Sequence, residues 1–271
     1  MKTEAIAKWD DIHKYAKPGW LFRGQRNATW DLSTSFERTC DRVKIAHDKR
    51  RGLEDRLFRE FRRTYHLYSQ HVPERTAIVE WLSLMQHHGA PTRLLDFTYS
   101  IYVAAYFATE TADADSAIWA IDGPWALAQA AKLLRGVGKP TSDVDQMLER
   151  FQEGDEAVVA NLFFTEPYVA CAWPINAFRV NQRLRIQQAA FFITGDVGQQ
   201  FMANLLALSD QDMDNHLFKI LIPEVEGRSI PRRLFSMGMS RTNLFPGIDG
   251  FAESLAVWNP AFDPWDWKRI V

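Results

Sequence analysis

A run of polar residues between two apolar segments is the feature that most constrains this chain. The run covers residues 86–98 and includes His88, Thr92, Arg93 and Asp96. Polar groups next to a core are costly unless they are paired or used. We therefore expect these four side chains to form either a functional site or a hydrogen-bonded network that fixes a turn between two helices. The two helices are indicated by apolar residues at helical spacing, namely Trp81, Leu82, Leu84 and Met85 before the run and Ile101, Val103, Ala104, Ala105 and Phe107 after it.

A second polar feature is Arg23, which follows a short apolar strand pattern and directly precedes Gly24. The planar guanidinium group of an arginine at a strand end can bind a phosphate or carboxylate through two parallel hydrogen bonds. A glycine in the next position lets the backbone approach a ligand closely, and Gln25 is placed to assist. The alternative is a structural arginine that pairs with a core carboxylate such as Asp96.

These two segments resemble the FRG domain family. Residues 22–24 are similar to its F/Y-R-G signature, and residues 87–98 are similar to its H-H-G-x-P-T-R-L-L-D-x-T block. Residues 181–191 and 243–250 also fit the family, although Ala189-Ala190 stands where it often has a glycine. The resemblance implies one FRG-type domain over residues 1–271, with a core of about 10–257.

A weaker resemblance links residues 21–24 to the aromatic-Arg-Gly strand of ADP-ribosyltransferases of the Arg-Ser-Glu class. It implies that Arg23 holds NAD and that a carboxylate stabilises the ribosyl cation, in an ADP-ribosyltransferase-like fold. Residues 33–35 match the Ser-Thr-Ser of that class but lie too near Arg23 to form its second strand. Glu224 and Glu226 have the spacing of its acidic pair and follow an apolar strand pattern.

Further candidate residues lie later in the chain, each with a structural alternative. Gln187 lies in a strand-like run over residues 184–194, where its amide contacts a ligand or stabilises the fold. Asp249 either faces an arginine across a cleft as an acid or caps the N-terminus of a helix. Of the two adjacent histidines, we prefer His88 to His87 as an acid or base, because His88 lies one helical turn from Leu84. The candidate catalytic residues are therefore Arg23, His88, Arg93, Asp96 and Asp249, and the candidate cofactor-binding residues are Arg23, Gly24, Gln25, Thr92 and Gln187.

These residues predict an NAD-using, ADP-ribosyltransferase-like enzyme, of the kind found among bacterial toxins and phage-defence effectors, with a protein or nucleic acid as acceptor. One alternative is a non-catalytic module that binds a nucleotide or another phosphate-bearing ligand. Another is a nucleic-acid enzyme with a basic groove formed by Arg56, Arg59, Arg62 and Arg63, although a solvated helix face explains these arginines too. The spacing of His and Cys predicts no metal site, and no glycine-rich phosphate loop occurs.

The overall composition favours a folded α+β domain in which a helical part packs on a modest mixed sheet. The chain of 271 residues is 46% hydrophobic and has a net charge of -2, so no general basic footprint for nucleic acid is present. Cys40 and Cys171 are expected to be reduced thiols, and neither a signal region nor a membrane span is recognisable, so we expect a cytoplasmic protein. The pattern predicts helices over residues 3–16, 52–70, 75–88, 100–109 and 199–209, a mostly helical segment over 123–162 that is broken near Gly136-Gly138-Pro140, and helices opening at 229 and 246. It predicts strands over 20–24, 116–121, 217–222 and 265–267, and a further strand within 184–194.

Overall fold

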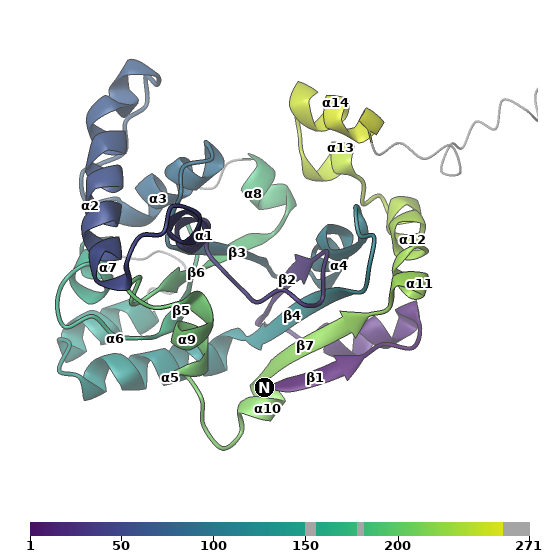
Figure 1. The fold of residues 1–271 in the computed structure, drawn as a ribbon, viewed down its shortest axis with the longest axis horizontal. Helices are drawn as coiled ribbons and strands as arrows, with labels where there is room; N and C mark the ends of the chain where they lie inside the picture. The colour runs from purple at the N-terminus through teal and green to yellow at the C-terminus, as the bar shows by residue number, and fades with distance from the viewer. Residues whose placement is uncertain (150–155, 178–181, 257–271) are drawn as a thin grey trace, which may run out of the picture.

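The computed structural model describes residues 1–149, 156–177 and 182–256, which form a mixed sheet surrounded by helices (Figure 1). The seven strands lie in the order β1-β7-β4-β2-β3-β6-β5, and only the β1–β7 pair is parallel. This arrangement confirms the predicted α+β class, with a larger sheet than expected. The predicted strand at 265–267 lies outside the described residues. The strands are β1 (Lys2–Ala5), β2 (Trp20–Gln25), β3 (Leu94–Thr98), β4 (Ser116–Asp122), β5 (Ala172–Ile175), β6 (Ala189–Thr194) and β7 (Leu217–Ile222).

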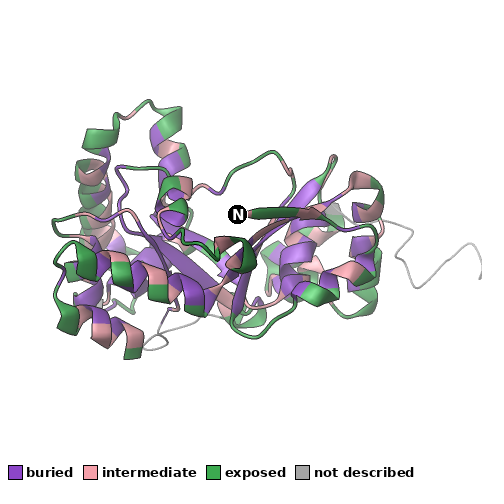
Figure 2. Cartoon of the chain, turned by 90° about the horizontal axis from the view of Figure 1, so that it is seen from below, coloured by how far each residue is buried: buried purple, intermediate pink, exposed green. Residues whose placement is uncertain are grey.

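The helices pack on the sheet through two hydrophobic clusters. One cluster joins α3 (Ile78–His87), α5 (Gly123–Gly136), α6 (Thr141–Glu149) and α7 (Glu156–Phe163) to the β3–β6–β5 side. The other joins the 3₁₀ helix η1 (Trp9–Tyr15), α4 (Ile101–Thr109) and α12 (Ile230–Ser236) to the β2–β4–β7 side. Figure 2 shows buried strands between helices whose outward faces are exposed. The remaining helices are α1 (Ser35–Arg42), α2 (His47–Thr64), η2 (Tyr65–Leu67), α8 (Gln182–Ile186), α9 (Phe201–Leu206), α10 (Met213–His216), α11 (Glu224–Gly227), α13 (Arg241–Leu244) and α14 (Ile248–Ala256).

The junction between β2 and β3 is the weakest pairing in the sheet. These strands are in register at one position only, Phe22 opposite Thr98. By contrast, every residue of β2 from Trp20 to Gln25 pairs with β4, and every residue of β3 pairs with β6. The sheet therefore consists of two well-paired halves that meet at a seam between β2 and β3.

Several predicted elements are confirmed by the structure. α3 ends at His87 and is followed by Gly89 with φ +81°, the left-handed conformation that favours glycine at a helix end. α4 begins after Ser100, whose hydroxyl accepts a hydrogen bond from Val103 N at 3.3 Å. β4, β7 and α12 also lie where the pattern predicts them.

Three predictions about local structure are wrong. The polar run is not only a turn between helices, because residues 94–98 form the central strand β3. The segment predicted as one helix over residues 3–16 is instead β1 followed by η1, since Lys2–Ala5 pairs with β7. Residues 184–194 do contain the predicted strand, β6, but Gln187 does not lie in it as predicted, because α8 and a left-handed residue, Gln188 with φ +47°, precede Ala189.

Candidate functional site

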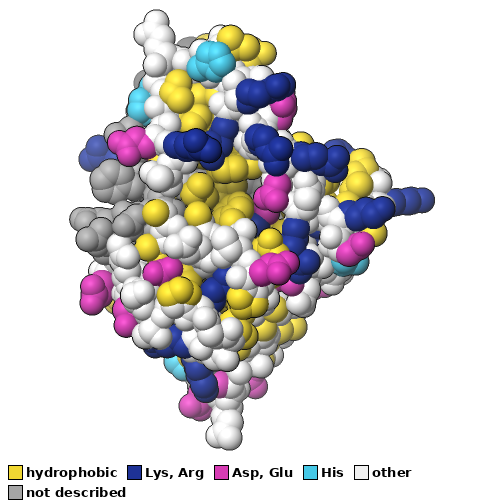
Figure 3. Space-filling model, turned by 90° about the vertical axis from the view of Figure 1, so that its left-hand side faces the viewer, with side chains coloured by type: hydrophobic (Ala, Val, Ile, Leu, Met, Phe, Trp, Pro, Cys, Tyr) yellow, Lys and Arg dark blue, Asp and Glu magenta, His cyan; other side chains and the backbone are white. Residues whose placement is uncertain are grey.

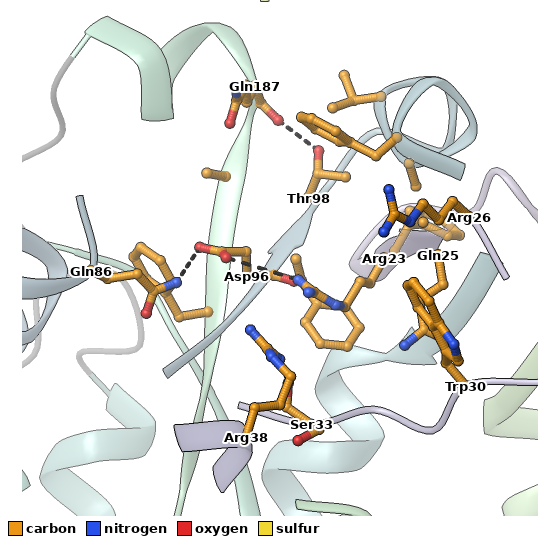
Figure 4. Close-up of a pocket in the computed structure, with 18 of the residues that line it drawn as sticks. Arg23, Gln25, Arg26, Trp30, Ser33, Arg38, Gln86, Asp96, Thr98 and Gln187 are labelled. Atoms are coloured by element: carbon orange, nitrogen blue, oxygen red, sulfur yellow. Dashed lines mark hydrogen bonds and ion pairs between the residues drawn. The ribbon is translucent and has the colours of Figure 1, made fainter. Parts of the chain in front are cut away.

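A cavity of about 1020 Å³ opens at the seam between β2 and β3. Its walls come from the ends of both strands, from the loop that follows β2, and from α1, α3, α4 and α8. Figure 4 shows Arg23, Arg38, Gln86 and Asp96 gathered in its centre. A smaller cavity of about 190 Å³ adjoins it, and the same four residues line both. The cavity thus lies where β2 and β3 are in register at only one position.

Arg23 bridges the seam with part of its guanidinium group. Its Nη1 donates a hydrogen bond to the main-chain oxygen of Asp96 at 2.6 Å, and lies 3.9 Å from Oδ2 of the Asp96 carboxylate. Its Nε is buried and has no hydrogen-bond partner among the described residues. Burial lowers the pKa of Arg23, the charge of Asp96 opposes this change, and the charge of Arg38 adds to it. The side chain is 23% exposed, so the guanidinium group remains a cation that is partly accessible at the cavity wall.

Asp96 is held in place by a chain of hydrogen bonds that starts at Thr92. The Thr92 hydroxyl donates to Oε1 of Gln86 at 2.6 Å, and Nε2 of Gln86 donates to Oδ1 of Asp96 at 2.6 Å. The side chain of Asp96 is nevertheless 57% exposed, because it faces the cavity. Two consequences follow: the carboxylate is fixed in orientation, and Oδ2 is available to a ligand.

Sequence reasoning missed two cavity residues on α1, Glu37 and Arg38. The helix begins after Thr34, whose hydroxyl accepts a hydrogen bond from Glu37 N at 3.1 Å. Arg38 is exposed toward the cavity and donates to the main-chain oxygen of Ser33. Glu37 is 8% exposed, and burial raises its pKa even though Phe201 N donates to its Oε2 at 3.0 Å. The amphipathic pattern of residues 35–42, not used in our sequence interpretation, is the signal that points to this helix.

Gly24 lines the cavity and also has a packing role, while its predicted role in ligand approach stays a prediction. A Cβ atom at this position would lie 1.9 Å from the main-chain oxygen of Ala104 in α4. The glycine therefore lets α4 lie against β2, on the side where Phe22 is buried. Gln25 lines the cavity, but its amide is occupied: Oε1 accepts from Trp119 Nε1 at 2.7 Å, and Nε2 donates to Asp31 O at 3.0 Å.

The structure separates Arg93 from the cavity. Its side chain is 2% exposed and forms a two-pronged ion pair with the buried carboxylate of Glu54. Its Nη1 donates to the main-chain oxygens of Phe163 at 2.7 Å and Thr194 at 3.2 Å. The ring of Phe164 lies 3.9 Å from the guanidinium carbon. Arg93 therefore joins α2, α7 and β6 to the start of β3, and it does not face the space that we predicted it would share with His88.

The other predicted residues are divided between the cavity and its surroundings. His87 lines the cavity whereas His88 does not, which reverses our preference. Burial lowers the pKa of His87, and the charges of His88 and Arg183 lower it further. Gln187 lines the cavity, but its Nε2 donates to Leu244 O at 2.9 Å.

Thr92 is buried and acts through Gln86, whereas Asp249 is exposed on α14 and does not line the cavity. The acids of the predicted Glu-x-Glu pair have other partners. Glu224 pairs with Arg228, and Glu226 accepts from Trp9 N at 2.7 Å.

A second charged surface lies on α2. Arg56, Arg59 and Arg63 are exposed, and Arg62 lies over the rings of Phe58 and Trp81. Figure 3 shows Lys and Arg side chains around a hollow with a hydrophobic floor, on the side of the molecule where α2 lies. In the described parts of the chain, no group of three or more His, Cys, Asp or Glu side chains is arranged to hold a metal ion. No helix among those residues has the length and apolar character needed to cross a membrane.

Comparison with known proteins gives one match. No curated protein matches the chain, and no solved structure matches it. The predicted similarity to ADP-ribosyltransferases stays a prediction, as does the extent of the domain beyond the match. The family model of the FRG domain matches residues 18–117, a range that contains both Arg23 and Asp96. Residues 18–117 of the chain are therefore similar to the FRG domain family.

Proposed function

We propose that the seam cavity binds NAD and that the protein breaks the bond between nicotinamide and ribose. The observation that carries this proposal is the arrangement of Arg23 and Asp96, a partly exposed cation and an exposed, oriented carboxylate on the same cavity wall. An arginine of this kind binds phosphate, and a carboxylate stabilises positive charge that develops on a sugar carbon.

The size and lining of the cavity support a dinucleotide as ligand. Its volume of about 1020 Å³ lies at the upper end of the range of about 300–1,000 Å³ for small-molecule sites. Arg23 and Arg38 supply cationic groups for a diphosphate, and Phe22, Phe97 and Phe107 supply apolar surface. The apolar part of the lining lowers the local dielectric constant, which strengthens the interaction between Asp96 and a developing cation.

In this reaction the carbon–nitrogen bond at C1′ of the ribose breaks, and its electron pair leaves with neutral nicotinamide. The carboxylate of Asp96 stabilises the positive charge on C1′. Gln86 keeps that carboxylate in position through its hydrogen bond to Oδ1. Water, or a hydroxyl or amine of an acceptor, adds to C1′ and passes its proton to Asp96. With water as acceptor the result is loss of NAD, which fits the predicted toxin or defence effector.

The test is release of nicotinamide from NAD by the purified protein, with Arg23→Ala and Asp96→Asn as variants. Arg228→Ala is the matched control, because Arg228 is 75% exposed and outside the cavity. We expect release by the wild type and by the control, and loss in both cavity variants. Binding of NAD without release, even after addition of cell extract as acceptor, would instead support the non-catalytic binding module. Equal release by all four proteins would contradict the assignment of this site.

A further inference from the structure

Trp30 is an exposed aromatic side chain on the wall of the cavity. It is 45% exposed, although large aromatic rings are normally buried more deeply. It lies in the loop that follows β2, close to Gln25 and on the same side of the cavity as Arg26 (Figure 4). An exposed indole ring beside a cationic pocket can provide a flat surface for a ligand ring.

The loop that carries Trp30 is held by hydrogen bonds at both ends. At its start, Ala28 N donates to Asp115 O at 2.7 Å, and Thr29 N donates to Oδ1 of Asn27 at 2.8 Å. At its end, the amide of Gln25 donates to Asp31 O at 3.0 Å. These contacts order the loop before any ligand arrives, which lowers the entropic cost of binding.

Lys219 fixes the backbone of Trp30 itself. Its Nζ donates to the main-chain oxygen of Trp30 at 3.1 Å, while lying 4.8 Å from the ring centre of Trp119 in the neighbouring strand. Trp119 in turn donates to Gln25. Lys219, Trp119 and Gln25 thus connect β7, β4 and β2 to the backbone at Trp30, so the residue that carries the exposed ring is anchored to the sheet.

Arg26 adds a stacked cation to the same surface. Its guanidinium carbon lies 5.2 Å from the ring centre of Trp30, and no carboxylate pairs with it among the described residues. Both groups line the cavity that contains Arg23 and Arg38. Stacked indole and guanidinium groups next to further arginines are a combination that suits a nucleobase joined to phosphates.

We propose that Trp30 and Arg26 form a stacking site for the nucleobase of a nucleotide whose diphosphate is held by Arg23 and Arg38. This inference rests on the proposed binding of NAD in the same cavity, but it concerns recognition of the base and not the cleavage step. According to this proposal, the loop after β2 makes the pocket selective for ligands that carry a nucleobase.

Isothermal titration calorimetry with ADP and with inorganic pyrophosphate tests this assignment, because the two probes share a diphosphate and differ in the nucleoside. The proteins are the wild type, Trp30→Ala, Trp30→Phe and, as matched control, Tyr68→Ala. Tyr68 is 84% exposed and outside the cavity. We expect Trp30→Ala to weaken ADP binding by about tenfold or more, as for loss of one base–aromatic stack, and to leave pyrophosphate binding unchanged. Trp30→Phe should retain most of the ADP affinity, and Tyr68→Ala all of it.

The outcomes separate this site from the cleavage activity. Dependence of ADP binding on Trp30, together with absence of nicotinamide release by the wild type, would support the stacking site and contradict the proposed reaction. Equal ADP affinity of Trp30→Ala and the wild type would overturn the stacking site, whether or not nicotinamide is released. Failure of the wild type to bind ADP would overturn it as well.

Discussion

Arg23 lies in β2 and Arg93 directly precedes the neighbouring strand β3, but their surroundings differ in almost every respect. Arg23 faces a cavity and leaves Nε without a partner. Arg93 is enclosed by Glu54, two main-chain oxygens and an aromatic ring. Asp96, near Arg23, is exposed and accepts a hydrogen bond from the neutral amide of Gln86, whereas Glu54, which pairs with Arg93, is 5% exposed.

The comparison shows that burial and unused hydrogen-bonding capacity distinguish a binding arginine from a structural one. A fully paired, buried guanidinium can release no donor to a ligand without leaving its carboxylate uncompensated. A guanidinium with a single firm contact keeps donors for a phosphate at little structural cost. Ligand recognition should therefore depend on Arg23, and folding should depend on Arg93.

The largest expected effect is that of Arg93→Met on stability. It leaves the Glu54 carboxylate buried without a cation, and breaking a buried pair in this way costs about 3–5 kcal/mol of unfolding free energy. Chemical denaturation followed by circular dichroism measures it. The double variant Arg93→Met, Glu54→Leu should recover much of the loss, because it removes the unpaired charge. A single variant as stable as the wild type would remove the distinction between the two arginines.

Gly24→Ala should have the next largest effect. The added methyl group would meet the main-chain oxygen of Ala104 at 1.9 Å, so α4 must move away from β2. Overpacking of this kind costs about 1–3 kcal/mol, and sometimes more. Gly52→Ala in α2 is the matched control, because no atom lies within 4 Å of a Cβ at that position. Thermal melts that show no difference between the two variants would argue for a ligand role of Gly24 after all.

Arg23→Lys should change function with a small change in stability. The variant keeps the charge but loses the planar fork, so we expect nicotinamide release to fall by at least about 10²-fold, as for other losses of an oriented donor. Unfolding free energy should fall by no more than about 1.5–3 kcal/mol, the range for one hydrogen bond of a charged group. Rates of nicotinamide release and unfolding curves, recorded on the same sample, measure the two effects. A variant that unfolds would place Arg23 with Arg93 as a structural residue.

Glu37→Gln should have the smallest effect, and its sign depends on pH. The folded-state pKa of Glu37 is raised by burial, so the folded protein binds this proton more tightly than the unfolded chain. The protonated Glu37 side chain therefore contributes to the free energy of unfolding. This contribution is complete below the unfolded-state pKa of about 4.3 and is lost as pH rises through the folded-state pKa. The amide, which is neutral and can still accept from Phe201 N, should therefore make the variant more stable than the wild type at pH 7 but not at pH 4. Urea titrations at both pH values test this, and an opposite pH trend would contradict it.

The order of elements was more predictable than the function of individual polar residues. α4, β4, β7 and α12 follow from apolar spacing and from Ser100 and Pro231 at helix starts. β3 was not recognised, because Asp96 interrupts the apolar pattern of a central strand. An exposed side chain can occupy this position only because β2 does not pair with β3 there. That property depends on two segments about 70 residues apart, so no local pattern can contain it.

The same reasoning explains which site residues were found. Arg23 and Asp96 stand out because each interrupts an apolar run. Gln86, Glu37 and Arg38 do not stand out, because polar residues on exposed helix faces are common. Arg93 directly precedes an apolar strand pattern, much as Arg23 follows one, and only its pairing with Glu54, from a helix 39 residues earlier, shows that Arg93 is structural.

The single register position between β2 and β3 has a mechanical consequence. Forces between the two halves of the sheet pass mainly through Phe22, Thr98 and the contact of Arg23 with the main chain of Asp96. A ligand that contacts both strands adds a second connection in parallel with these. It should therefore stiffen the sheet as a whole, so that amide hydrogens slow their exchange in β5 and β1, at the two outer edges, and not only beside the ligand.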